Sequence, residues 1–271
     1  MNNAVERAAR FIWEHYSEPL SLTDIARSAL LSRFHFARVF KDTTGVTPGR
    51  FLSAVRIYQA KHLLLTTSMS ITDISFAVGY NSPGSFINNF TESVGASPSR
   101  FRRLIRCGGL DAPCPRQRAP RPQGSVQGTI SLPDGYRDAR VYVGVFNTAI
   151  VRNQPASAAI HMVTAGQPFP YYLPDVPGGT WFVHVVGVAD STDPEPWTRR
   201  VALIATRGMV SVTAGVTTYV SLVLRPQQPT DPPILLALPS LEMLPEGYAR
   251  EQTPTVTAGD LGFIPESLNR R

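Results

Sequence analysis

The sequence has few cysteines and no long apolar run. Its two cysteines, Cys107 and Cys114, lie in a stretch rich in glycine, proline and arginine, and no second pair completes a zinc site. We therefore expect reduced thiols without a structural role. No apolar run approaches the roughly 20 residues of a membrane-spanning helix. We expect a cytoplasmic protein that does not contact a membrane.

Motifs of catalytic sites are also missing. The sequence contains no glycine-rich phosphate loop, no His-Glu-x-x-His pair and no Gly-x-Ser-x-Gly nucleophile elbow. Its Asp, His and Ser residues are scattered rather than grouped in a recognisable pattern. We therefore expect no enzyme activity, no metal and no cofactor.

Positive charge is concentrated in the first half of the chain. Residues 1–123 hold 16 Lys and Arg against 8 Asp and Glu, a net charge of +8, whereas residues 124–271 hold 10 against 12, a net charge of −2. Lys41 and Lys61 are the lysines of the first half, so arginine dominates there. Clustered basic residues displace counterions from phosphate, which makes nucleic acid the first partner to consider.

A length of 271 residues suits two domains. Prolines and a lack of apolar periodicity over 108–123 predict an extended linker. We therefore predict a helical domain over 1–107, the linker, a β domain over 124–225 and a proline-rich tail over 226–271. The fold class is multidomain α and β.

One unit occurs twice in the first half. The run Ser21-Leu-Thr-Asp-Ile-Ala26 recurs as Ser70-Ile-Thr-Asp-Ile-Ser75, 49 residues later. Farther along, the offset becomes 50, which places a one-residue insertion around 79–81. The residues that match at this offset are Phe36, Phe40, Gly45, Pro48, Arg50 and Phe51 in the first copy and Phe86, Phe90, Gly95, Pro98, Arg100 and Phe101 in the second.

Each copy has the pattern of a helix, a turn and a second helix. A serine followed three residues later by an aspartate, at Ser21 and at Ser70, is typical of a helix start. The first helices are expected over about 22–29 and 71–78, and the second helices begin near Ser32 and Ser82. A helix over about 3–16 precedes the first copy. A long helix from Pro48 to about Thr67 joins the two copies.

These residues resemble the AraC/XylS family of transcription regulators. The motifs are Leu20-Ser-Leu-Thr-Asp-Ile-Ala26, Ser32-Arg-Phe-His-Phe-Ala-Arg-Val-Phe-Lys41, Gly45-Val-Thr-Pro48 and Ala77-Val-Gly-Tyr80, followed by Phe86 to Pro98. The resemblance covers about residues 3–104. It implies two helix-turn-helix units that read adjacent major-groove segments of double-stranded DNA, and a transcription activator that contacts RNA polymerase.

The resemblance also implies a role for the second helix of the first copy. It would present Arg33, Phe34, Ala37 and Arg38 to the groove, with His35 and Lys41 nearer the phosphates. Arg38 is the best candidate for reading a base, because a guanidinium can donate to both O6 and N7 of guanine. Arg38 could instead be a solvated surface residue. His35 could close the turn, and Phe34 could belong partly to the core.

The second copy departs from the family pattern. Asn88 stands where an arginine is usual, and Thr91 and Glu92 stand where basic residues are common, so we expect weaker phosphate binding. Asn88 can still read adenine, while Pro83 and Gly84 offer no long side chain. The other candidate contacts are serines and arginines, which could hold phosphates; the arginines could instead only keep the end of the domain soluble. They are Ser82, Ser85, Arg102 and Arg103, with Arg100, Arg106, Arg116, Arg118 and Arg121 nearby.

The second half changes to a period of two. Eight short segments alternate apolar and polar residues, which predicts an antiparallel β-sandwich of roughly seven strands. The segments are 126–132, 140–146, 158–163, 169–173, 181–188, 200–205, 209–212 and 217–224. The half faintly resembles carboxypeptidase regulatory-like or transthyretin-like domains in Gly124-Ser-Val-Gln-Gly-Thr-Ile130, Ala139-Arg-Val-Tyr-Val143, Gly178-Gly-Thr-Trp-Phe-Val183 and Val212-Thr-Ala-Gly-Val-Thr-Thr-Tyr-Val220.

Three roles for the β domain remain open. It could sense a small-molecule effector, form a homodimer or dock a partner. An alternative hypothesis makes it a carbohydrate- or peptide-binding module tethered to DNA. Aromatic and histidine side chains could line a pocket or simply pack in the core; they are Tyr171, Tyr172, Trp181, His184 and Trp197.

Overall fold

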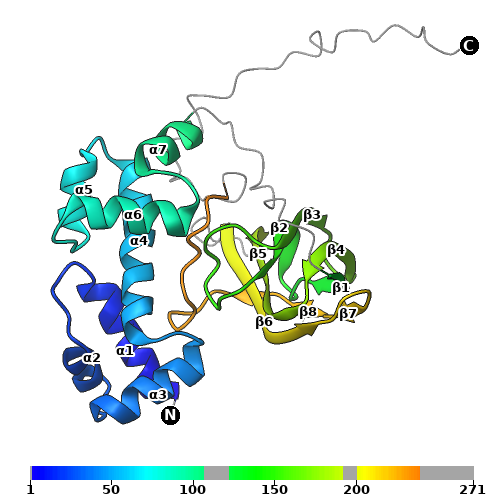
Figure 1. Ribbon diagram of the computed structural model, residues 1–271, viewed down its shortest axis with the longest axis horizontal. Coiled ribbons are helices and arrows are strands. Elements are labelled where there is room, and N and C mark those ends of the chain that lie inside the picture. Colours follow the sequence, from blue (N-terminus) through cyan, green and yellow to red (C-terminus); the bar gives the residue numbers. More distant parts are fainter. Residues whose placement is uncertain (1, 107–121, 192–199, 239–271) are drawn as a thin grey trace, which may run out of the picture.

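The computed structural model describes residues 2–106, 122–191 and 200–238. Cys107, Cys114 and Trp197 lie outside these ranges. The described residues form seven helices, followed by nine strands (Figure 1). The helices are α1 (Asn2–His15), α2 (Leu22–Ser28), α3 (Arg33–Thr44), α4 (Pro48–Thr66), α5 (Ile71–Ala77), α6 (Pro83–Val94) and α7 (Pro98–Arg106). The strands are β1 (Gln123–Ser131), β2 (Tyr136–Phe146), β3 (Ser157–Val163), β4 (Phe169–Pro177), β5 (Gly179–Ser191), β6 (Arg200–Val212), β7 (Thr217–Tyr219), β8 (Leu222–Val223) and β9 (Arg225–Pro226).

The expected helix starts are present in both copies. Ser21 accepts a hydrogen bond from the backbone amide of Asp24, and the Asp24 carboxylate accepts one from the amide of Ser21. Ser70 likewise caps α5 through the amide of Asp73. These caps satisfy backbone amides that have no partner inside the helix. The hydrogen bonds from Ser21 are also the main reason why the pKa of Asp24 lies below its usual value.

The repeated phenylalanines form two equivalent clusters. Phe40 meets Phe51 edge to face at a centroid distance of 5.4 Å, and Phe90 meets Phe101 in the same way at 5.7 Å. In both copies the second helix is therefore packed against the start of the helix that follows it. All four rings are fully buried. This packing fixes the second helix of each unit and turns its other face outward.

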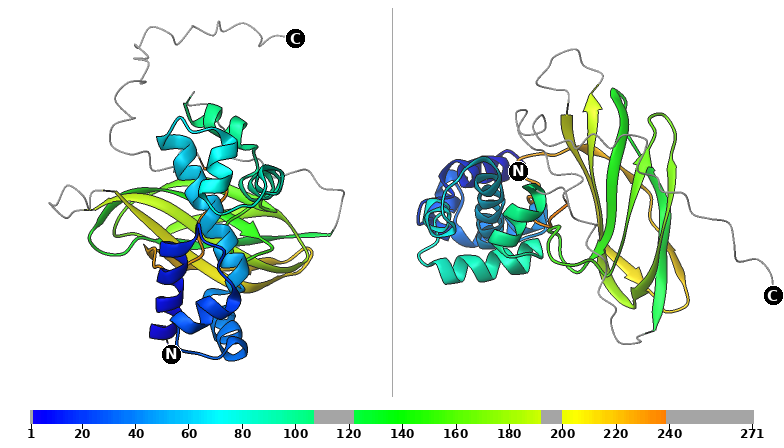
Figure 2. Two further views of the ribbon diagram at one scale, coloured as in Figure 1. Left: turned by 90° about the vertical axis from the view of Figure 1, so that its left-hand side faces the viewer. Right: turned by 90° about the horizontal axis from the view of Figure 1, so that it is seen from above.

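Two sheets make up the β region. One has the order β4-β1-β7, with β8 also paired to β1, and the other has the order β3-β2-β5-β6-β9. Their facing side chains share one apolar cluster, which includes Val126, Leu173, Val143 and Val185. Figure 2 shows the two layers of strands beside the helical half.

The β region departs from the expected strand pattern in two respects. Strands β7 and β8 pair with β1 in parallel, so the first sheet is mixed rather than wholly antiparallel. The segments expected as separate strands over 200–205 and 209–212 form one strand, β6. A register shift opposite Trp181 and Val183, with a positive φ of 58° at Met209, interrupts its alternation. This β-bulge breaks the alternation of β6, so the sequence pattern resembles two strands separated by a turn.

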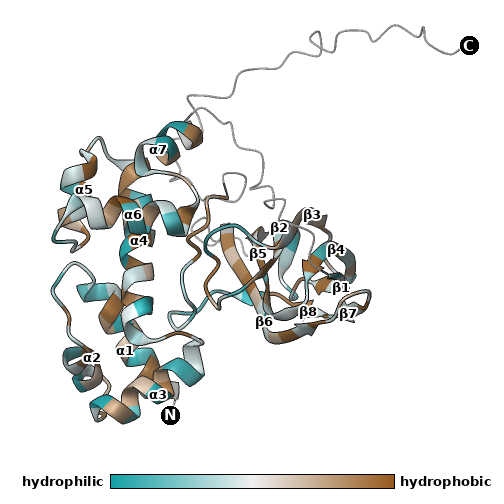
Figure 3. Ribbon diagram, in the orientation of Figure 1, coloured by the Kyte–Doolittle hydropathy of each residue, from teal (hydrophilic) through white to brown (hydrophobic). Residues whose placement is uncertain are grey.

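The predicted proline-rich tail begins with an ordered, buried segment. Residues 227–238, which we call the strap, run between α4 and the second sheet (Figure 1). The leucines of the strap are buried, and Figure 3 colours much of this segment as hydrophobic. The sheet that contains β2 and β5 is consequently covered on both faces. No helix in the described ranges is long and apolar enough to cross a bilayer.

Candidate nucleic-acid interface

The turns between the paired helices are equivalent in the two copies. Leu30 and Gly79 occupy matching positions with positive φ angles of 58° and 84°. Leu31 donates to the carbonyl of Ala26, and Tyr80 donates to the carbonyl of Ser75, at the same offset of 49. The next matching residues are the helix caps Ser32 and Ser82, at an offset of 50. The inserted residue is therefore Asn81, within the predicted interval.

The second helix of the first unit, α3, presents the predicted face to solvent. Arg33, His35, Arg38 and Lys41 are exposed, and Ala37 is partly exposed. Phe34 is 79% exposed, so it is not a core residue. The Arg33 guanidinium lies 4.9 Å from the centroid of the Phe34 ring, in cation–π geometry. This arrangement places a planar, positively charged pair at the first turn of α3.

The opposite face of α3 is buried. Phe36, Val39 and Phe40 pack in the helical core, with exposed fractions of 5% or less. Since residues three and four apart share a helix face, the exposed and buried sets lie on opposite sides. The periodicity thus predicted correctly which face of α3 is free.

The second unit presents a less basic surface on α6. Ser82, Gly84, Ser85 and Asn88 are exposed, and Pro83 is partly exposed. The Ser82 hydroxyl accepts from the backbone amide of Ser85 at 3.3 Å and donates to its hydroxyl at 3.0 Å. Ser82 and Ser85 therefore start the helix as well as facing solvent.

Asn89 is the partly buried neighbour of Asn88 and has a structural function. Its side-chain amide donates to the hydroxyl groups of Ser53 on α4 and Tyr80 in the turn, at 2.9 and 2.8 Å. These bonds link α6, α4 and the turn before α6. Asn88 is the asparagine that remains exposed for a partner.

The long helix α4 connects the two units. Its 19 residues correspond to about 28 Å at about 1.5 Å per residue. Arg56, in the middle of α4, donates to the carbonyls of Tyr16 and Glu18 at 2.8 and 2.7 Å. Its guanidinium also faces the ring of Tyr80 at 6.0 Å. Arg56 thus ties the segment after α1 to the turn of the second unit, a function that the sequence analysis missed.

The two arginines proposed on α7 are placed differently. Arg102 donates to the carbonyl of Leu64 at 3.2 Å and to the carbonyl of Met69 at 2.7 Å. These carbonyls lie at and beyond the end of α4, so Arg102 joins α7 to that end. Arg103 is exposed. The Arg102 guanidinium thus has intramolecular partners, whereas Arg103 faces solvent.

The residues considered for a pocket in the β region do not converge. The Tyr171 hydroxyl donates to the carbonyl of Val220, and the Trp181 indole donates to the carbonyl of Pro177, both inside the core. Tyr172 points outward and is 55% exposed. His184 is buried against Thr148 and Thr206. In the described ranges no three His, Cys, Asp or Glu side chains gather closely enough to hold a metal ion.

Comparison with known proteins identifies the helical half. A family profile described as a helix-turn-helix domain matches residues 25–104. The lactose operon transcription activator of Staphylococcus xylosus is 36% identical over 102 residues, which cover 38% of this chain and 37% of that protein. The regulator ExsA of Pseudomonas aeruginosa is 34% identical over 102 residues, with the same coverage. The chain therefore spans little more than a third of the length of these relatives.

A solved structure gives a similar match. The DNA-binding domain of the global transcriptional factor AdpA, crystallised with a target DNA, is 29% identical, with a TM-score of 0.37. The alignment covers 38% of this chain and 94% of that domain. The two sequence alignments span 102 residues each, about the length of the helical half rather than of the whole chain. Residues 25–104 are a helix-turn-helix DNA-binding domain of the AraC type.

Proposed function

We propose that this protein is a sequence-specific transcription regulator that reads two adjacent major-groove segments with α3 and α6. The supporting observation is the exposure of equivalent faces on two helix-turn-helix units joined by one helix. Successive major-groove segments on one side of B-DNA are about 34 Å apart. The α4 helix spans about 28 Å, to which the reading helices add their own width. One chain can therefore reach both segments without a second subunit.

Within the first unit, Arg38 is the proposed base reader. It lies in the second turn of α3, and its guanidinium can donate in parallel to guanine O6 and N7. Arg33, Phe34 and Ala37 share the exposed side of the helix, where Phe34 can contact a thymine methyl. His35 and Lys41 are proposed to contact phosphates.

Within the second unit, polar groups replace the basic ones. Asn88 is proposed to pair with adenine, and the hydroxyls of Ser82 and Ser85 to contact phosphate. Pro83 and Gly84 let the start of α6 approach the DNA backbone closely, because neither has a long side chain. Arg103 is the proposed phosphate contact on α7. Arg102 is left out of this surface because it binds the end of α4.

Activation is the proposed direction of regulation, with RNA polymerase as the partner. One of the two relatives above is named a transcription activator. A protein that binds one asymmetric site as a monomer leaves its other faces free for a polymerase. The β-sandwich would then sense an effector, form a homodimer or dock a partner.

A second candidate function is a carbohydrate-binding β region. Tyr172 and Tyr219 are 55% and 75% exposed, and the strand register pairs both with Gln127 on β1. The three side chains form a row on the outer face of the first sheet, with a polar group between two flat rings. Such rows suit an extended neutral sugar chain. Calorimetric titration with cellohexaose, xylohexaose and maltohexaose tests this; no heat of binding from any of them would remove the candidate.

The main test is selection of bound sequences from a random duplex pool at a stated salt concentration. The expected product is an asymmetric site with two contact blocks about one helical turn apart. A palindrome would instead indicate dimeric binding and support a dimerising β region. No enriched sequence would refute the proposed function.

A further inference from the structure

The ends of both reading helices meet the β region. Residues 147–153, in the loop between β2 and β3, are called the bridging loop. Its Ala149 Cβ lies 2.8 Å from the position that a Cβ on Gly45 would occupy, directly after α3. Its Asn153 backbone amide donates to the carbonyl of Ser93 in the last turn of α6 at 2.8 Å. One short loop therefore contacts the carboxyl ends of α3 and α6.

The strap also contacts the end of α6, and in addition it contacts α1. The amide of Ala237 donates to the carbonyl of Val94, the last residue of α6, at 3.1 Å. The Trp13 indole on α1 donates to the carbonyl of Pro229 at 3.2 Å. The strap thus runs from the first helical unit to the second.

The bridging loop and the strap are bound to each other. The carbonyl of Val151 accepts from the amides of both Leu235 and Leu236, at 2.8 and 3.0 Å. His184 on β5 fixes the start of the loop through the carbonyl of Thr148 at 2.9 Å. The two segments therefore form one hydrogen-bonded unit attached to the second sheet.

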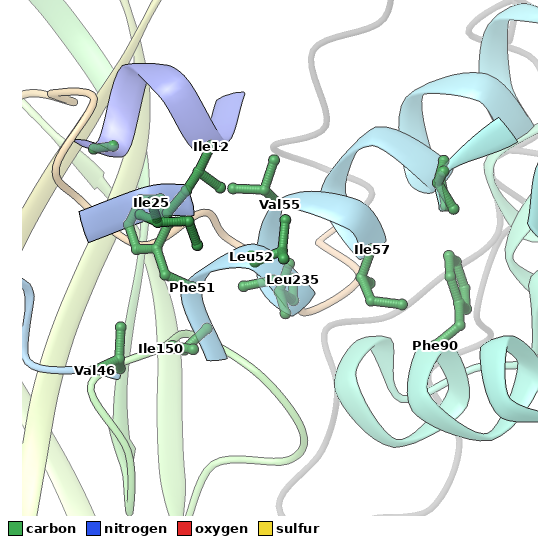
Figure 4. Close-up of a cluster of buried hydrophobic side chains, with 14 of the residues drawn as sticks. Ile12, Ile25, Val46, Phe51, Leu52, Val55, Ile57, Phe90, Ile150 and Leu235 are labelled. Carbon is green, nitrogen blue, oxygen red and sulfur yellow. The ribbon is translucent and has the colours of Figure 1, made fainter. Parts of the chain in front are cut away.

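Side chains of this unit enter both cores. Ile150, Leu235 and Ala237 are buried in the helical core, and Figure 4 shows Ile150 and Leu235 among Val46, Leu52 and other side chains of that core. Leu236 and Leu238 pack on the other side against a cluster that includes Tyr142 and Phe146 of β2. This alternation buries the strap on two sides, which makes it costly to detach.

The strap also binds α4, the helix that joins the two units. Lys61 on α4 is 4% exposed, and its ammonium group donates to the carbonyls of Leu236 at 3.2 Å and Ile234 at 3.4 Å. The group also lies 5.5 Å from the centroid of the Phe101 ring. A buried ammonium needs such partners, because its desolvation is unfavourable. The contact therefore fixes the strap along α4.

We propose that the bridging loop and the strap set the separation of the two reading helices and thereby the spacing of the DNA site. This inference rests on the proposed function. A tilt of about 7° at one end of a helix about 28 Å long moves the other end by about 3.4 Å, one base-pair step. Contacts at both helix ends and along α4 restrict such tilts. They leave Arg33, Phe34 and Gly84 at the starts of the reading helices exposed.

Spin-label distances measured without DNA test the mechanical part. Labels would be placed by Lys41→Cys on α3 and Thr91→Cys on α6, in a chain with Cys107→Ser and Cys114→Ser. Ala149→Glu wedges the bridging loop away from Gly45, while Val223→Glu introduces the same charge at an exposed position of the other sheet. We expect one narrow distance distribution for the parent and for Val223→Glu, and a broader or shifted one for Ala149→Glu. An unchanged distribution would overturn the inference.

Leu235→Ala gives a second variant that acts through the strap instead of the loop. It removes side-chain packing on α4 and keeps the backbone bonds to Val151, so we expect the same broadening. Because the two variants act at different places, a folding defect in one does not remove the test. A narrow parent-like distribution in both would show that the helices hold their separation alone.

Duplexes with altered spacing test the consequence for recognition. Moving the two contact blocks by one base pair is expected to weaken wild-type binding about tenfold and binding of Ala149→Glu less than about threefold. Equal penalties in both proteins would overturn the inference. If the wild-type protein enriches no site, the proposed function fails, and the spin-label distances still decide whether the β region holds the helices.

Discussion

The imidazole of His184 holds the carbonyl of Thr148 at 2.9 Å, at the start of the loop that meets both reading helices. A carbonyl can only accept, so Nε2 carries the proton and Nδ1 accepts from the Thr206 hydroxyl at 2.9 Å. The ring is stacked on Phe182 and is 1% exposed. Burial lowers the pKa of His184 to about 4, although the bond to Thr148 opposes this shift.

The buried neutral imidazole predicts a pH-dependent stability. Above about pH 6.5 His184 is neutral in both states and adds no pH dependence. Between about pH 6.5 and 4 the unfolded chain takes up a proton that the folded chain does not, so the free energy of unfolding falls by about 1.4 kcal/mol per pH unit. Below about pH 4 this contribution levels off.

Urea denaturation at several pH values checks this, with His184→Gln as the variant. The variant should be less stable at pH 7 and should lack this part of the slope between pH 6.5 and 4. His161, whose pKa is also lowered by burial, is present in both proteins and cancels in the comparison. Parallel pH profiles would contradict the assignment.

Substitutions at the equivalent turn residues Leu30 and Gly79 should change the free energy of unfolding in opposite directions. Leu30 is 81% exposed at a positive φ of 58°, so Leu30→Gly relieves backbone strain at little loss of burial. We expect a gain of up to about 1 kcal/mol in the free energy of unfolding. Gly79→Leu should destabilise the protein, because a Cβ there lies 2.7 Å from the carbonyl oxygen of Ser17. Thermal denaturation of both variants decides; changes of the same sign would contradict the interpretation.

The adjacent arginines on α7 are expected to affect different properties, Arg102 the stability of the fold and Arg103 the binding of DNA. Arg102→Ala should lower the free energy of unfolding by about 1.5–3 kcal/mol, because two carbonyl groups lose a charged donor. Arg103→Ala should change it by less than about 0.5 kcal/mol but should reduce the salt dependence of DNA binding by about one phosphate contact. Denaturation curves measure the free energy of unfolding of each variant, and DNA binding at several salt concentrations measures the salt dependence. Equal effects of the two changes would exclude this division.

Removing the guanidinium of Arg38 should reduce specificity. Arg38→Ala is expected to lower affinity for the selected site by about 1–3 kcal/mol and to leave nonspecific binding nearly intact. Arg140→Ala, which removes an exposed charge from β2, serves as the control and should change neither. Equal loss on all sequences would make Arg38 a phosphate contact instead.

A basic residue at position 88 should strengthen DNA binding by the second unit. Asn88→Arg adds an exposed guanidinium to α6, so affinity at low salt should rise and the slope of log affinity against log salt should steepen by about 0.9. Gln167→Arg adds the same charge at an exposed site between β3 and β4 and should leave the slope unchanged. If both variants behave alike, α6 does not face the DNA backbone.

The sequence alone predicted the local elements of the helical half. Capping serines, the 3.6-residue period and the repeated phenylalanines determine helices over short stretches of chain, so their bounds and the free face of α3 follow from nearby residues. The insertion was also visible to within residues 79–81, because a repeat supplies its own alignment, and the structure places it at Asn81.

Only the tertiary structure decided which distant residues meet. Lys61 and Leu236 are 175 positions apart, and nothing near either of them indicates their contact. The run from Val141 to Phe146 is buried on both faces because the strap covers the outer face of β2, whereas alternation predicts one covered face. The parallel pairing of β7 with β1 and the partners of Arg102 likewise depend on the packing of separate elements. Local sequence patterns determine the backbone conformation and which face of an element is buried. Which distant element packs against that face depends on the tertiary fold.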